Sequence, residues 1–204
     1  MALNPDKLNA FIGKAVGDIG AALVANIVLL GDKLGLYNAM AKAGPVTPTE
    51  LAKATKTAGR LGNQAAGGYM THDAGTGRCT VSEEQAMTLA DKNSPCFLPG
   101  AFHVNAATFA ANPKIAQRFK TGKELRWAYH DHRLVKGTER LFRPNYLGNL
   151  VANWIPSLDG LREKLKRSTK VKDGSCGFGA SIIIMAKAYL TSPSSASTRI
   201  NPQY

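Results

Sequence analysis

The chain has 204 residues, enough for one or two small domains, and 44% of them are apolar, which supports a packed core and argues against wholesale disorder. Lys and Arg number 26 against 14 Asp and Glu, and the resulting net charge of +12 favours polyanionic or nucleotide-like partners. The three cysteines, Cys79, Cys96 and Cys176, form no C-x-x-C pair. We therefore expect no disulfide framework, no metal site and a reducing, cytoplasmic location.

The opening third is helical and unusually apolar. Asn4-Pro5-Asp6 is typical of a helix start, and apolar residues then recur at helical spacing. Gly17 and Gly20 predict a break or a close helix crossing before a second apolar helix, and Gly44-Pro45 predicts the end of this region. The longest apolar run, 19–30, is too short to span a bilayer, so no membrane partner is expected. Two explanations remain for the apolar surface, an intramolecular core and a homodimer interface.

A helix, a turn, a second helix and a two-stranded hairpin follow. Thr47-Pro48-Thr49-Glu50 is a capping box that opens a short helix, and residues 56–66 form a second, glycine-containing helical stretch. Residues 69–73 and 78–81 form the expected hairpin, and Ser82-Glu83-Glu84-Gln85 caps the next helix. This order is typical of a winged-helix module.

Residues 95–167 are predicted to be mostly helical. Within them His130-Asp131-His132 has no further metal ligands at a familiar spacing, so we expect no metal there. The basic residues between Arg162 and Lys172 could bind phosphate or simply form a solvated face.

A glycine-rich loop carries the most informative pattern. Residues 170–173 form a short expected strand, residues 174–179 are glycine-rich, and a helix begins at Ala180. This geometry lets backbone N–H groups and a helix N-terminus face a nucleotide-like ligand, and glycine permits the positive φ angles of the turn. The tail at 191–204 is polar and of low complexity, so we expect it to be disordered.

Asp173, Gly177 and Gly179 resemble motif I of class I S-adenosylmethionine (SAM)-dependent methyltransferases, D-x-G-x-G-x-G, with Ser175 at the first glycine position. Stretches 30–37, 64–69, 137–144 and 149–158 resemble bacterial members that carry an N-terminal winged helix. The resemblance implies SAM as cofactor and a small-molecule methyl acceptor. It implies a SAM-binding set made of Asp173, Gly174, Ser175, Cys176, Gly177, Phe178 and Gly179. It also makes Trp127, His130 and Arg133 candidates for the substrate side.

The expected fold is mainly α with a small β-wing. It comprises a helical, winged-helix dimerisation domain at 1–92, a helical linker and substrate-side region at 93–168, and an incomplete Rossmann-like (α/β) start at 169–190. Because no Asp or Glu follows Asp173 and a lone βα unit cannot form a core, we expect an N-terminal methyltransferase fragment that is inactive as an isolated chain. Residues from about 170 are expected to be poorly ordered, or to pack against the helices before them in a way unlike the family.

Two other functions remain open. A winged-helix DNA-binding transcriptional regulator would suit the net charge of +12. It is not favoured, because the segment that would read DNA offers only Lys56 and Arg60 and is rich in glycine. The other alternative is a dimerisation module without catalytic activity.

Overall fold

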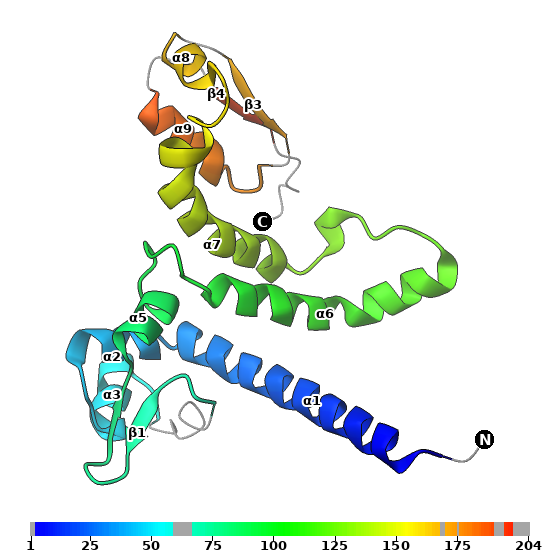
Figure 1. The fold of residues 1–204 in the computed structure, drawn as a ribbon, viewed down its shortest axis with the longest axis vertical. Coiled ribbons are helices and arrows are strands. Elements are labelled where there is room, and N and C mark those ends of the chain that lie inside the picture. Colours follow the sequence, from blue (N-terminus) through cyan, green and yellow to red (C-terminus); the bar gives the residue numbers. More distant parts are fainter. Residues whose placement is uncertain (1–2, 59–66, 168–169, 175, 190–193, 198–204) are drawn as a thin grey trace. The chain divides into compact units, whose positions relative to one another are not determined.

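The computed structural model describes residues 3–58, 67–167, 170–174, 176–189 and 194–197 (Figure 1). It divides into two compact units, Met1–Ala86 and Met87–Tyr204. The boundary lies a few residues before the expected division at 92, and the segments expected at 93–168 and 169–190 share the second unit. The architecture is mostly helical, with two small two-stranded sheets in the described residues.

Helix α1 (Pro5–Lys33) opens the first unit, and its start is capped as predicted. The Asn4 side chain accepts hydrogen bonds from the backbone N–H groups of Asp6 at 3.0 Å and Lys7 at 3.1 Å. The predicted break is wrong, because α1 runs without interruption through Gly17 and Gly20. A glycine costs a helix only about 1 kcal/mol, which the many helix-forming neighbours offset. A Cβ at either position would meet nothing within 4 Å, so there is no close crossing among the described residues.

The core of the first unit lies where α1 ends and α2 (Leu36–Ala43) begins. Tyr37 is fully buried, and its ring packs so closely on Gly31 that a Cβ there would lie 2.8 Å from it. Helix α3 (Pro48–Thr55) adds Leu51 to this core. Its capping box is confirmed: Glu50 N–H donates to the Thr47 hydroxyl at 3.2 Å, and Thr47 N–H donates to the Glu50 carboxylate at 2.8 Å.

Strands β1 (Thr71–Asp73) and β2 (Arg78–Thr80) form the expected antiparallel hairpin, with His72 opposite Cys79. The Asp73 carboxylate closes the turn by accepting bonds from Gly75 N–H at 2.8 Å and the Thr76 hydroxyl at 2.7 Å. Helix α5 (Glu83–Leu89) follows, capped by Ser82 as predicted. Most of the helix expected at 56–66 lies outside the described residues, so the winged-helix arrangement stays a prediction.

The second unit is helical over most of 95–167, as predicted. Its elements there are α6 (Pro99–Thr121), the 3-10 turn η1 (Trp127–Tyr129), α7 (His132–Asn149), the π-helical turn η2 (Leu150–Trp154) and α8 (Leu161–Lys166). Helices α6 and α7 cross at two glycines. A Cβ on Gly137 would lie 2.8 Å from the Gly100 carbonyl oxygen and 2.9 Å from the Val104 nitrogen. Glycine is thus what lets the two backbones meet.

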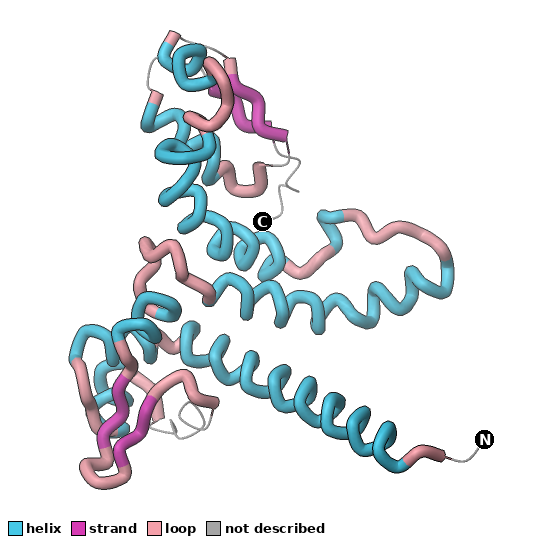
Figure 2. The backbone as a smooth tube through the Cα atoms, in the orientation of Figure 1, coloured by secondary structure: helices cyan, strands magenta, loops and turns pink. Residues whose placement is uncertain are grey.

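The end of the chain is more ordered than its composition predicts. Strand β3 (Val171–Gly174) leads to α9 (Ala180–Ala188) and pairs in parallel with β4 (Ser194–Ser197). Figure 2 shows the two strands side by side. Residues 194–197 thus form a strand within the tail expected to be disordered, and its pairing uses backbone N–H and C=O groups rather than side chains. The remaining tail residues, 191–193 and 198–204, lie outside the described part.

The segment after 170 also shares a core with the helices before it. Ile155, Leu165 and Tyr189 are buried together, and Val171 of β3 and Met185 of α9 pack against them. Two outcomes were expected from about residue 170, poor order or packing against the preceding helices, and β3 and α9 show the second. Their apolar side chains find partners on η2 and α8, so this segment does not depend on a large sheet for its packing.

Candidate functional site

The glycine-rich loop connects β3 to α9 in the way the sequence predicts. Gly177 and Gly179 have φ angles of 57° and 76°, a conformation that side chains other than glycine rarely adopt. Gly179 stands at the N-cap of α9, and its N–H donates to the Cys176 carbonyl at 2.8 Å. A Cβ on Gly174 or Gly177 would meet nothing within 4 Å. The described loop therefore has open space beside its backbone, as a ligand cradle requires.

Asp173 is held in place across this loop. The hydroxyl of Ser181, in the first turn of α9, donates a hydrogen bond to the Asp173 carboxylate. This bond ties the end of β3 to the start of α9 and so fixes both ends of the turn. Sequence reasoning missed Ser181, although its place two residues beyond the loop was a usable signal. Ser175, predicted to take part, lies outside the described residues.

A cavity of about 710 Å³ lies between the loop and α7. From the loop side it is lined by residues of β3, the turn and the first part of α9. These are Asp173, Gly174, Cys176, Gly177, Phe178, Ala180 and Ser181. Five of the seven predicted SAM-binding residues thus line one cavity, while Gly179 stands behind them as the helix cap.

The opposite wall of the cavity comes from η1 and one face of α7. It consists of Trp127, Val135, Thr138, Glu139, Phe142 and Tyr146. The five α7 residues follow one another at intervals of three or four, apart from the adjacent Thr138 and Glu139, and so share a face of the helix. Sequence reasoning assigned Phe142 and Tyr146 only to an apolar stretch. Their spacing places them on the same helix face as Glu139, but spacing alone does not tell a cavity face from a core face.

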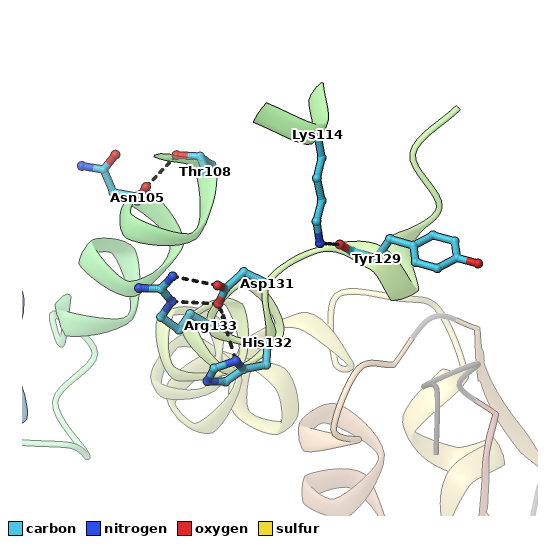
Figure 3. A network of polar contacts seen from close by, with 7 residues as sticks. All are labelled: Asn105, Thr108, Lys114, Tyr129, Asp131, His132 and Arg133. Atoms are coloured by element: carbon cyan, nitrogen blue, oxygen red, sulfur yellow. Dashed lines mark hydrogen bonds and ion pairs between the residues drawn. The ribbon is translucent and has the colours of Figure 1, made fainter. Parts of the chain in front are cut away.

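The three predicted substrate-side residues lie in different places relative to the cavity. Trp127 lines the cavity, and the His130 ring, which does not line it, lies 5.5 Å from the Trp127 ring between centroids. Arg133 does not reach the cavity lining. Its guanidinium forms two 2.7 Å hydrogen bonds to Asp131, which caps α7 through the Arg133 N–H at 2.9 Å (Figure 3). The role of Arg133 on the substrate side therefore stays a prediction, and its guanidinium is engaged by a capping carboxylate two residues away.

Arg133 and Asp131 act on each other electrostatically. Hydrogen bonding from the Arg133 guanidinium holds the pKa of the Asp131 carboxyl well below its ordinary value, and Asp131 raises the pKa of Arg133 in return. The pair fixes the start of α7, on which the cavity wall depends. Nearby, the Lys114 ammonium donates to the Tyr129 carbonyl at 2.8 Å and ties η1 to α6 (Figure 3).

Across the described part of the chain, no group of three or more His, Cys, Asp or Glu side chains is arranged to hold a metal ion.

No family model and no curated protein matches this chain in sequence. Solved structures do match its fold. PigF with SAH is 14% identical with a TM-score of 0.59, and the match covers 91% of this chain and 58% of PigF. The mitomycin 7-O-methyltransferase MmcR is 18% identical with a TM-score of 0.58, covering 94% of this chain and 59% of MmcR. Human N-acetylserotonin methyltransferase with SAM is 11% identical with a TM-score of 0.56, covering 96% and 60%.

These matches lend no support to the alternative of a DNA-binding regulator. The chain spans about three-fifths of the length of the structures it matches. At these identities the likeness concerns the fold. The fold of this chain therefore corresponds to about three-fifths of the length of solved SAM-dependent O-methyltransferases.

Proposed function

We propose that this chain forms the acceptor-binding wall and the first SAM-contacting loop of a methyltransferase that acts on a small molecule. The observation that carries the proposal is the cavity, which has the glycine loop on one wall and Trp127, Phe142 and Tyr146 on the other. The fold shared with SAM-dependent methyltransferases supports it. On this proposal, residues 169–190 are the first βα unit of a Rossmann-like cofactor domain.

The loop suits the amino-acid end of SAM. Its glycines leave open space, and the turn ends at the N-terminus of α9, where backbone N–H groups are available to a carboxylate. Residues 174–179 would hold the cofactor, which when bound supplies an electrophilic methyl group. The α7 wall would orient the acceptor and exclude water, which is how positioning contributes to such a transfer.

We further propose that these 204 residues transfer no methyl group by themselves. In the described part of the chain β3 pairs only with β4, whereas a doubly wound cofactor domain rests on several parallel strands. No Asp or Glu follows Asp173 that could bind the ribose hydroxyls. Binding of SAM should therefore be weak and confined to the glycine loop.

The test is a titration of the full chain with S-adenosylhomocysteine (SAH), followed by the backbone amide signals in NMR spectra. We expect shifts at Gly177 and Phe178 that saturate only at millimolar SAH, with no methyl transfer from SAM. A Gly177→Val variant should lose these shifts. Absence of shifts in the loop at millimolar SAH, or saturation there at micromolar SAH, would overturn the proposal.

We also propose that the first unit is a winged-helix domain that forms a homodimer through α1. Ile12, Val16, Ile19 and Leu23 are all half or more exposed and form one stripe along the helix. By length and composition α1 could also cross a membrane. We favour self-association, because the ion pair of Lys14 with Asp18, at 2.5 Å, sits in the middle of the helix. We also propose a cytoplasmic location, because the three cysteines are odd in number and form no C-x-x-C pair.

Sedimentation of the full chain tests this interface. A Val16→Asp/Leu23→Asp double variant should shift the chain from dimer to monomer. The matched control is Ala10→Asp/Ala21→Asp, which adds the same charge on the opposite side of α1 and should leave the dimer intact. A wild-type chain that is monomeric, or that partitions into vesicles of neutral lipid, would contradict the proposal.

A further inference from the structure

Four aromatic side chains surround the cavity between α7 and the glycine loop. Trp127, Phe142, Tyr146 and Phe178 all line it. The rings of Phe142 and Tyr146 stack at 24° with centroids 6.3 Å apart. The side chain of Trp127 is 56% exposed, and those of Phe142 and Phe178 are also exposed. Exposed rings gathered around one hollow are typical of a surface that a flat ligand covers.

The charge of the same cavity is opposite to that of the chain. Its described lining contains two carboxylates, Glu139 and Asp173, and no Lys, Arg or His. The chain as a whole carries a net charge of +12. A cavity lined in this way favours a cation over an anion, since its described lining contributes two carboxylates and no cationic side chain to the local potential.

Of the two lining carboxylates, Glu139 is the one better placed to accept a hydrogen bond from a ligand. Asp173 already accepts the Ser181 hydroxyl. Glu139 is only 23% exposed, and its ion pair with Arg143 spans 3.7 Å, beyond hydrogen-bond distance. Arg143 itself is 60% exposed, so water screens it. The Glu139 oxygens can therefore accept a charged hydrogen bond from a ligand in the cavity.

We propose that the cavity binds a flat aromatic molecule that carries a protonated amine, with Glu139 as its charge partner. The aromatic rings provide the stacking surface and attract the cation through their faces. This inference rests on the proposed function, because it names the class of methyl acceptor that the site would select. Glu139 is thus a specificity-determining residue.

The test uses three probes that share a naphthalene ring and differ in charge. They are 2-naphthylmethylamine, the neutral 2-naphthylmethanol and the anionic 2-naphthoate. Occupancy is read from the rate at which iodoacetamide alkylates Cys176, which lines the cavity, with the exposed Cys96 as internal control. We expect the amine to slow Cys176 alone, the alcohol to bind more weakly and the carboxylate to have no effect.

A matched pair of variants assigns the effect to one carboxylate. Glu139→Gln should raise the Kd of the amine about tenfold and leave that of the alcohol unchanged. Glu163→Gln removes a carboxylate that pairs with Lys166 on α8, away from the cavity lining, and should change neither Kd. Naphthoate binding as tightly as the amine, or Glu139→Gln weakening the amine and the alcohol equally, would overturn the inference.

The SAH titration separates this inference from the proposed function. If the amine binds as described but SAH shifts no loop amide, the methyltransferase proposal fails and the charge preference of the cavity stands. If SAH shifts the loop and the amine does not slow Cys176, the acceptor class is wrong and the proposed function stands.

Discussion

Helix α7 presents two contrasting faces. Toward α6 it offers Gly137, and the two backbones approach so closely that no side chain fits between them. Toward the glycine loop it offers Glu139, Phe142 and Tyr146 around an open cavity. A helix braced on one side can present side chains on the other with little freedom of position. The site therefore depends as much on the packed face of α7 as on the residues that line the cavity.

The largest expected effect comes from breaking the packed face. Gly137→Leu places a side chain where its Cβ alone would lie 2.8 Å from the Gly100 carbonyl oxygen. The helices must separate, and we expect the free energy of unfolding to fall by about 3 kcal/mol in urea denaturation. Gly148→Ala, on the same helix with nothing within 4 Å of the added Cβ, should instead stabilise the chain slightly. Equal effects of the two variants would refute the close crossing.

A smaller effect is expected on the cavity side. Gly179→Val forces a β-branched residue into a φ of 76° and should cost about 2 kcal/mol in the same denaturation experiment. Gly174→Ala also adds a side chain at the loop, but its φ is not positive and its surroundings are open, so little change is expected. If Gly179→Val is as stable as the wild type, the loop does not adopt the turn described.

The smallest effect concerns the start of α7, which orients both faces. Asp131→Ala removes its cap and should cost about 1 kcal/mol at neutral pH. Because Arg133 lowers the pKa of Asp131 in the folded chain, the stabilisation is complete above the unfolded pKa of about 4. It is lost as the pH falls from there through the folded pKa. The difference between variant and wild type should therefore shrink in acid, and a difference that grows would contradict the assignment.

Local signals in the sequence predicted local structure well. The caps at Asn4, Thr47 and Ser82 and the hairpin after residue 70 needed only neighbouring residues to form. The positive φ angles of Gly177 and Gly179 were likewise implied by residue type.

Features that depend on distant contacts were not predictable in the same way. Continuation of α1 through Gly17 and Gly20 reflects a balance of small helix propensities. The pairing of β4 with β3 brings together strands that lie 20 residues or more apart in sequence. For the site, the loop side could be predicted from its motif. The α7 wall could not, because helical spacing alone does not tell a cavity face from a core face.

Helix α7 and the glycine loop line one cavity, and Trp127 and Cys176 are both among its lining residues. A nitroxide attached to Cys176, in a chain carrying Cys96→Ser and Trp154→Phe, tests this arrangement, because a nitroxide within the same cavity quenches Trp127 fluorescence. We predict strong quenching in the folded chain and recovery of the emission in urea. Emission equal to that of the unlabelled chain would contradict the account.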